Sequence, residues 1–99
     1  MFTGAKYITQ GIKNKVPAFL QNILWYMIET MEVGQKDYLQ VFQLECVCEN
    51  GNQKQRIVHS QEQPPFQKEY IICAKKIVIE KIYVIDDDIH CTMLCADEY

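Results

Sequence analysis

The sequence predicts an α+β fold in which a single helix packs on an antiparallel sheet of four to six strands, in the chain order β-α-β-β-β-β-β. Three observations support this prediction. Apolar residues recur at spacings of three and four between positions 17 and 34, as on one face of a helix. The period changes to two over positions 38–48, as in a half-buried strand. An Asn-Gly pair then follows, which is typical of a tight hairpin turn.

The first third of the chain predicts one short strand and the helix. Positions 7–9 favour an extended conformation. Pro17 suits the first turn of a helix, where its missing N–H costs nothing, and Gly34 is a reasonable stop. The apolar stripe of the helix consists of Leu20, Ile23, Leu24, Met27, Ile28 and Met31.

The Asn50-Gly51 pair predicts a hairpin and its register. A type I′ turn needs positive φ at both central positions, which Asn and Gly tolerate. A two-residue turn here fixes three cross-strand pairs: Leu44 with Ile57, Glu45 with Arg56 and Phe42 with His59. Apolar groups then share one side of the ribbon, and opposite charges pair on the other.

Three further strands are expected at positions 66–73, 77–85 and 91–96. The prolines Pro64 and Pro65 end the second hairpin strand, because they cannot donate to a ladder. The acidic residues Asp86, Asp87 and Asp88 turn the chain into its last strand.

Composition limits the class of protein. The 99 residues, 48% hydrophobic and 23% charged, are expected to form one globular domain over positions 1–99. A net charge of −3 argues against a nucleic-acid partner, which normally requires a basic face. We expect no membrane span, because no apolar run reaches the roughly 18 residues that one needs. Without a signal-peptide pattern, the expected location is the cytoplasm.

The five cysteines are odd in number and lie inside apolar, strand-like runs, which predicts reduced, half-buried apolar residues. The softer metal ligands do not fit a zinc knuckle, in which two to four residues separate two cysteines on a turn, because Cys46 and Cys48 are expected to be same-face neighbours on a strand. These ligands are Cys46, Cys48, His90, Cys91 and Cys95.

Several segments resemble one protein family over nearly the whole chain. The segments lie at positions 37–42, 59–64, 81–86 and 92–94, with the neighbourhoods of Gly11-Ile12 and Leu24-Trp25 and the terminal Glu98-Tyr99. They are similar to uncharacterised proteins of Gram-positive bacteria and their phages, grouped as a staphylococcal domain of unknown function. The resemblance implies a bacterial, cytosolic protein, and it supplies no activity, cofactor or catalytic residue.

Two features suggest chemistry, and each has an ordinary structural explanation. The loop Asp86, Asp87 and Asp88 has carboxylates for a hard cation, but its spacing is not that of a calcium loop, and a solvated turn is favoured. His59 falls on the apolar side of the hairpin, where a packing role is favoured over a general base. We therefore identify no catalytic, cofactor-binding or metal-binding residue and expect no cofactor.

Trp25 is a candidate interface residue. At 100° per residue it lies near the middle of the polar helix face, so it either folds over the edge of the apolar stripe or contacts a second protein surface. Both alternatives stay open.

Two functional hypotheses follow. The first is a non-enzymatic protein-interaction module that acts as a homo-oligomer, most simply a dimer, because one helix is too narrow to cover a sheet with apolar groups on both faces. An unidentified protein partner is compatible with it. The alternative is a small enzyme whose site assembles from His59, Glu62 and the Asp86 to Asp88 loop.

Overall fold

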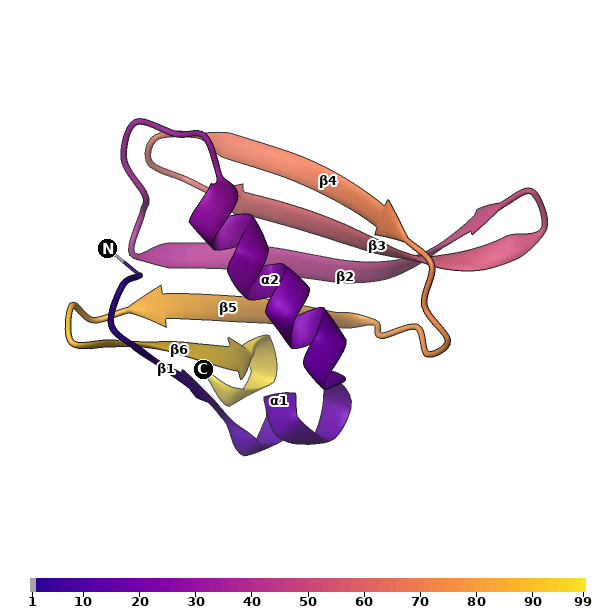
Figure 1. Ribbon diagram of the computed structural model, residues 1–99, viewed down its shortest axis with the longest axis horizontal. Helices are drawn as coiled ribbons and strands as arrows, with labels where there is room; N and C mark the ends of the chain where they lie inside the picture. Colours follow the sequence, from indigo (N-terminus) through magenta and orange to yellow (C-terminus); the bar gives the residue numbers. More distant parts are fainter. Residues whose placement is uncertain (1) are drawn as a thin grey trace.

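The computed structural model describes residues 2–99, which form one six-stranded mixed sheet with two helices. The strands lie in the order β1-β6-β5-β2-β3-β4. The elements are β1 (Ala5–Ile8), α1 (Gln10–Lys15), α2 (Ala18–Thr30), β2 (Leu39–Glu49), β3 (Asn52–Gln61), β4 (Phe66–Ile72), β5 (Glu80–Asp86), β6 (His90–Cys95) and the 3₁₀ turn η1 (Ala96–Glu98). Figure 1 shows α2 crossing the sheet diagonally.

The expectation of an antiparallel sheet is wrong at one strand. All other neighbours are antiparallel, but β1 pairs with β6 in parallel, with Lys6 opposite Cys91 and Ile8 opposite Met93. The first and last strands of the chain are therefore neighbours. Parallel neighbours need a crossover connection, and here the whole intervening chain supplies it.

The expectation of a single helix is also wrong, because α1 precedes α2. Thr9 is the N-cap of α1, with its hydroxyl accepting from the Ile12 amide, and Ile12 is fully buried. The cap residue and the basic last turn, Lys13 and Lys15, were the available sequence signals. At six residues, the helix is too short for hydrophobic periodicity to reveal it.

The predicted stripe on α2 forms the centre of the core. Leu20, Leu24, Met27 and Ile28 are buried in this helix, whereas Ile23 is half-buried at the edge of the core. The helix ends at Thr30, four residues before the predicted stop. In the described part of the chain, no helix is long and apolar enough to cross a membrane.

The hairpin prediction is confirmed. Asn50 and Gly51 have φ of 52° and 82°, and all three predicted cross-strand pairs are present. β2 pairs with β5 only as far as Leu44, so the outer part of the hairpin extends beyond the rest of the sheet (Figure 1).

One buried side chain fixes the connection from β4 to β5. After the edge strand β4, residues 73–79 bring the chain back past β3 to the other side of β2. Gln55, fully buried in β3, accepts from the Val78 amide (2.8 Å) and donates to the Val78 carbonyl (3.0 Å). The side chain thus replaces a strand partner for Val78. Position 78 was expected inside a strand, and β5 begins only at Glu80.

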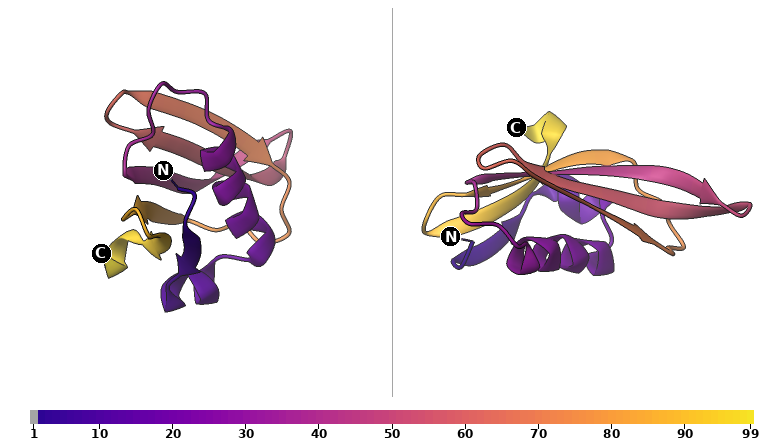
Figure 2. Two further views of the ribbon diagram at one scale, coloured as in Figure 1. Left: turned by 60° about the vertical axis from the view of Figure 1, so that its left-hand side comes forward. Right: turned by 90° about the horizontal axis from the view of Figure 1, so that it is seen from above.

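The two faces of the sheet are covered unequally. α2 packs on one face, whereas η1 lies on the opposite side, which we call the rear face (Figure 2, right). Side chains on the α2 side include Phe42, Ile57, Ile82 and Met93, all fully buried. Their neighbours along each strand point to the rear face.

Gly51→Val is expected to destabilise the protein by about 1–2 kcal/mol, because a β-branched residue is strained at positive φ. A Cβ at this position meets no atom within 4 Å, so the cost comes from the backbone alone. Urea unfolding measures it. Asn50→Gly is the control and should be nearly neutral; equal stability of Gly51→Val and wild type would contradict the turn.

Gln55→Met should destabilise the protein by about 2–4 kcal/mol, because the buried N–H and C=O of Val78 lose their partner. The matched control is Gln53→Met, two residues earlier on the same strand and exposed to solvent. Urea unfolding of both variants checks the difference, and a Gln55→Met loss no larger than that of the control would refute the role of this side chain.

Candidate functional site

The three groups proposed from the sequence as an enzyme site do not converge. His59 is fully buried in the middle of β3, Glu62 is exposed in the following turn, and the acidic loop joins β5 to β6. In the sheet, Phe42 of β2 has His59 of β3 on one side and Ile82 of β5 on the other. Asp86 lies four residues beyond Ile82 along β5. Strand geometry therefore separates His59 from Asp86 by about 16 Å.

His59 is a packing residue. Its ring stacks on Phe42 with centroids 4.4 Å apart and contacts Phe66 edge-on at 5.4 Å. Burial, together with the positive charges of Lys36 and Lys68, lowers the pKa of His59 to about 4. The imidazole is thus neutral near pH 7 and enclosed by protein.

His59 begins a chain of buried amides. Its Nε2 donates to Gln40 Oε1 (2.6 Å), and Gln40 Nε2 donates to Gln61 Oε1 (2.7 Å) and to the Asp37 carbonyl (2.9 Å). Gln61 in turn donates to the carbonyls of Gln35 and Pro64. These bonds attach two loops, residues 31–38 and 62–65, to the sheet. The buried polar groups therefore hold the backbone in place.

The acidic loop is a turn, as predicted, but only Asp87 and Asp88 are exposed, because Asp86 ends β5 and is buried. Asp86 Oδ1 accepts from the Asp88 amide (3.2 Å), and Asp88 has a φ of 77°. Asp87 accepts from the backbone and the ring of His90, and these bonds lower the pKa of Asp87 and raise that of His90. Asp86 Oδ2 is buried without a hydrogen-bond partner among residues 2–99.

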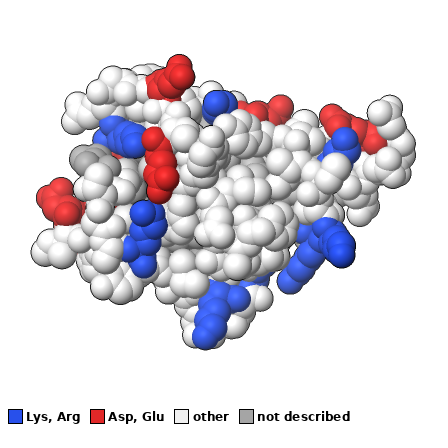
Figure 3. Space-filling view, viewed as in Figure 1, with Lys and Arg blue, Asp and Glu red and all other residues white. Residues whose placement is uncertain are grey.

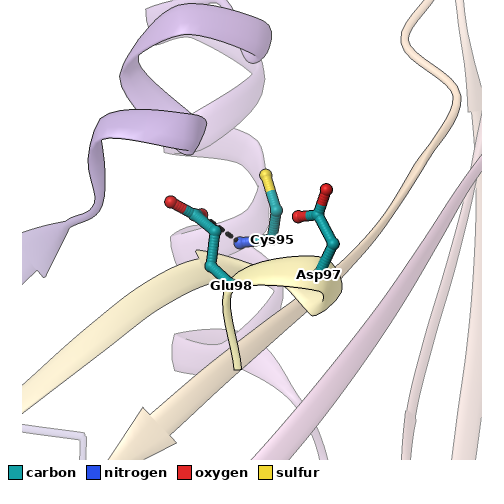
Figure 4. A group of neighbouring side chains, drawn as sticks. All are labelled: Cys95, Asp97 and Glu98. Carbon is teal, nitrogen blue, oxygen red and sulfur yellow. Dashed lines mark hydrogen bonds between the residues drawn. The ribbon is translucent and has the colours of Figure 1, made fainter.

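A cluster that sequence analysis missed lies at the C-terminus, where Cys95, Asp97 and Glu98 approach one another (Figure 4). The Glu98 carboxylate accepts from the Thr9 hydroxyl (2.6 Å), the Cys95 amide (2.9 Å) and the Gly11 amide (3.1 Å). These bonds lower the pKa of Glu98. Both carboxylate oxygens are therefore engaged in fastening η1 to the start of α1.

The Cys95 thiol does not favour metal binding either. Burial, reinforced by the charges of Glu98 and Glu80, raises the pKa of Cys95 to about 11, so the thiolate that metals require is scarce near neutral pH. Lys15 lies 3.6 Å from Asp97 and neutralises the second carboxylate. We interpret the cluster as a helix cap.

All five cysteines are free, but the half-buried environment predicted for them is wrong. Cys91 and Cys95 are buried, and Cys46, Cys48 and Cys73 are exposed. Cys46 and Cys48 are exposed because they lie on the outer part of the hairpin, beyond the pairing with β5.

Trp25 is 9% exposed and belongs to the core. Lys6 Nζ lies over its ring at 5.7 Å and also pairs with Glu29. Trp25 therefore folds over the edge of the apolar stripe, which is the first of the two alternatives given by the sequence. A contact of Trp25 with a second protein stays a prediction.

The rear face contains the candidate site, an apolar patch that follows two rows of paired residues. In one row Val41, Tyr83 and Leu94 are neighbours on β2, β5 and β6. In the other, Leu39 and Ile85 are followed by Thr92 and Tyr7. We call Tyr7, Leu39, Val41, Tyr83, Ile85 and Leu94 the rear patch.

A hollow of 280 Å³ opens at one border of the rear patch. Leu39 and Val41 belong to its lining, and three charged residues, Asp37, Glu62 and Lys81, also line it. The Glu62 and Lys81 side chains are exposed, and within residues 2–99 neither takes part in an ion pair. The Lys81 ammonium lies over the Tyr83 ring at 5.7 Å.

Stability is expected to depend on pH through His59. The unfolded chain protonates His59 near its ordinary pKa of 6.5 and the folded chain only near 4, so the unfolded state gains the proton first as the pH falls. The contribution of His59 is complete above pH 6.5 and decreases by up to about 3 kcal/mol as the pH falls to 4.

Urea unfolding at several pH values, compared between wild type and His59→Phe, measures this contribution. His59→Phe should flatten the slope between pH 6.5 and 4. The control His90→Gln should not flatten it, because Asp87 raises the pKa of His90, so this imidazole stabilises the fold as the pH falls. If the free energy of unfolding depends on pH in the same way in wild type and His59→Phe, burial does not lower the pKa of His59, and the prediction is wrong.

The comparisons with known proteins agree with this fold. No curated protein matches the sequence. A crystal structure of a protein of unknown function from Enterococcus faecalis superposes with a TM-score of 0.79, covering 97% of this chain and 91% of that chain. At 22% identity this likeness shows the fold alone.

A family model described as "Staphylococcal protein of unknown function (DUF960)" matches residues 5–98. The match confirms the resemblance seen in the sequence and covers every helix and strand of the sheet. The chain therefore belongs to this family of staphylococcal proteins of unknown function.

Proposed function

We propose that this chain is a non-enzymatic protein-interaction module of the bacterial cytoplasm that acts as a two-fold homodimer through the rear patch. The observation on which the proposal rests is the unequal covering of the sheet. One face is closed by α2, whereas on the rear face Tyr7 is 53% exposed and Leu39, Val41, Tyr83 and Ile85 are only half-buried. An apolar sheet face of this kind is typical of an interface.

The size of the face suits a dimer. Six strands spaced by about 4.8 Å, each about seven residues long, give a projected area on the order of 600 Å². Side chains make the accessible area larger than the projection. Each partner in a standard interface buries about 800 Å². Two sheets can pack face to face, about 10 Å apart, with apolar side chains from both in the layer between them.

The charges at the hollow favour a second copy as the occupant. A two-fold axis near the hollow can place Glu62 of each copy beside Lys81 of the other copy, so each would meet the opposite charge. Two equivalent ion pairs would form from side chains that have none in the single chain. At the far border, Arg56 already pairs with Glu45 and Glu69 and can serve as a polar rim.

The cytoplasmic location is supported by the free, exposed thiols of Cys46, Cys48 and Cys73, which a reducing compartment keeps as thiols. The proposal includes neither a nucleic acid nor a membrane as partner. The enzyme alternative has little support, because His59, Glu62 and the acidic loop lie apart and His59 is enclosed.

Light scattering coupled to size exclusion at micromolar concentration should give twice the 11.7 kDa mass of the chain. Val41→Lys should shift the protein to the monomer, because it places an unpaired charge in the centre of the apolar interface. Tyr26→Lys, on the opposite side of the molecule, is the control and should leave the dimer intact. A monomer at every concentration of wild type would end the proposal.

A charge exchange tests the two-fold arrangement itself. Glu62→Lys and Lys81→Glu should each weaken the dimer about tenfold through like-charge contacts, whereas the double variant should recover wild-type affinity. Sedimentation equilibrium measures the dissociation constants. Recovery requires that the two side chains meet across the interface, so additive losses in the double variant would exclude this geometry.

A further inference from the structure

The two flanks of α2 have different surroundings. Lys6 of β1 lies over the Trp25 ring, so the Trp25 flank faces the β1 end of the sheet. At 100° per residue, Phe19, Ile23 and Tyr26 lie about 100–160° around the helix from Trp25. Their flank therefore faces the opposite end of the sheet, where β3 and β4 lie.

The α2 side of β4 is incompletely covered. Tyr70 and Ile72 share this side because their partners, Ile57 and Gln55, are buried beneath α2. Tyr70, Ile72 and Ile23 are only half-buried against the core. The helix thus leaves an incompletely covered apolar strip between its own flank and the edge strand.

Exposed apolar side chains border this strip. Phe19 is 45% exposed and Tyr26 is 57% exposed. Figure 3 shows a broad surface without charged groups over α2 and the neighbouring strands, with basic and acidic side chains at its margin. We call Phe19, Ile23, Tyr26, Tyr70 and Ile72 the helix-side surface.

Three lysines next to this surface have no acidic partner. Lys68, on the α2 side of β4, lies over the Tyr70 ring at 5.1 Å, and Lys75 and Lys76 are exposed in the connection that ends at Ile79. Within residues 2–99 none of the three forms an ion pair, whereas Lys6, Lys15 and Lys54 do. The apolar surface thus has unpaired positive charge on a chain of net charge −3.

We propose that the helix-side surface binds a short acidic segment of another protein, with apolar side chains packed against Phe19, Tyr26 and Ile72 and carboxylates paired with Lys68, Lys75 and Lys76. Charge complementarity identifies the sign of the partner. Ile23, Tyr70 and Ile72 are half-buried beside α2, so a narrow segment that lies along the helix reaches them more readily than a flat surface does.

A bilayer or a nucleic acid fits the surface less well. Either would approach a large part of the molecule, whose overall negative charge repels anionic lipids and phosphates. A peptide segment contacts only the local lysines and the apolar strip beside them. Screening by salt should therefore weaken the complex without abolishing it, because the apolar contacts remain.

The test is selection from a random 15-residue peptide library displayed on mRNA, with the full chain as bait. Selected peptides should be rich in Asp and Glu alongside Leu, Ile or Phe. A fluorescent synthetic peptide of the selected sequence should bind wild type, and the double variant Lys75→Glu with Lys76→Glu should bind it at least about tenfold more weakly. Tyr26→Lys should weaken it as well.

The matched control is Lys81→Glu, a charge reversal on the rear face. It should bind the peptide within about twofold of wild type while weakening self-association, so failure of the dimer proposal and failure of this one are distinguishable. Thermal unfolding checks that each variant is folded.

Two results would overturn the proposal. One is selection of peptides without acidic residues, or equal binding of the acidic peptide by wild type and the lysine variant. The other is that wild type binds no selected peptide but binds phosphatidylglycerol vesicles or duplex DNA, and that the lysine variant loses this binding.

Discussion

The fold depends on one interaction, the pairing of the Gln55 side chain with the backbone of Val78. Strands β2, β3 and β4 form a meander that leaves the chain at the sheet edge, and the chain must return past β3 to place β5 beside β2. An irregular segment that crosses a core has backbone groups that water cannot reach. The buried amide of Gln55 satisfies them, so β5 can pair with β2, β6 with β5, and β1 with β6.

The same logic explains why so many polar side chains lie in this small interior. Gln40, Gln61 and His59 connect two loops to the sheet, and Glu98 fastens η1 to the start of α1. In each case the partner is a backbone group or a side chain bonded to one. These residues have the chemical types of an active site, yet their hydrogen bonds hold loops and helix ends in place. The side chains that remain available to a partner lie on the surface.

Two surfaces remain incompletely covered because one 13-residue helix lies on six strands. A helix is about 10 Å wide, and a sheet of this size is more than twice as wide. The rear patch is apolar, and charges of both signs line its hollow, which suits a second copy. Unpaired lysines lie next to the helix-side surface, which suits an acidic partner. A dimer through the rear patch would leave the helix-side surface of both copies open.

The sequence by itself determined what local rules decide: the α2 stripe, the Asn50-Gly51 turn with its register, the acidic turn and the family. Each follows from periodicity, a turn dipeptide or a segment of a few residues, which need no distant partner. Only the tertiary structure decided the parallel β1, the irregular β4–β5 connection at Val78, the burial of Trp25 and the exposure of Cys46. These depend on which distant elements become neighbours, and no local pattern records that. Thr9 and Glu98, 89 residues apart, meet for the same reason.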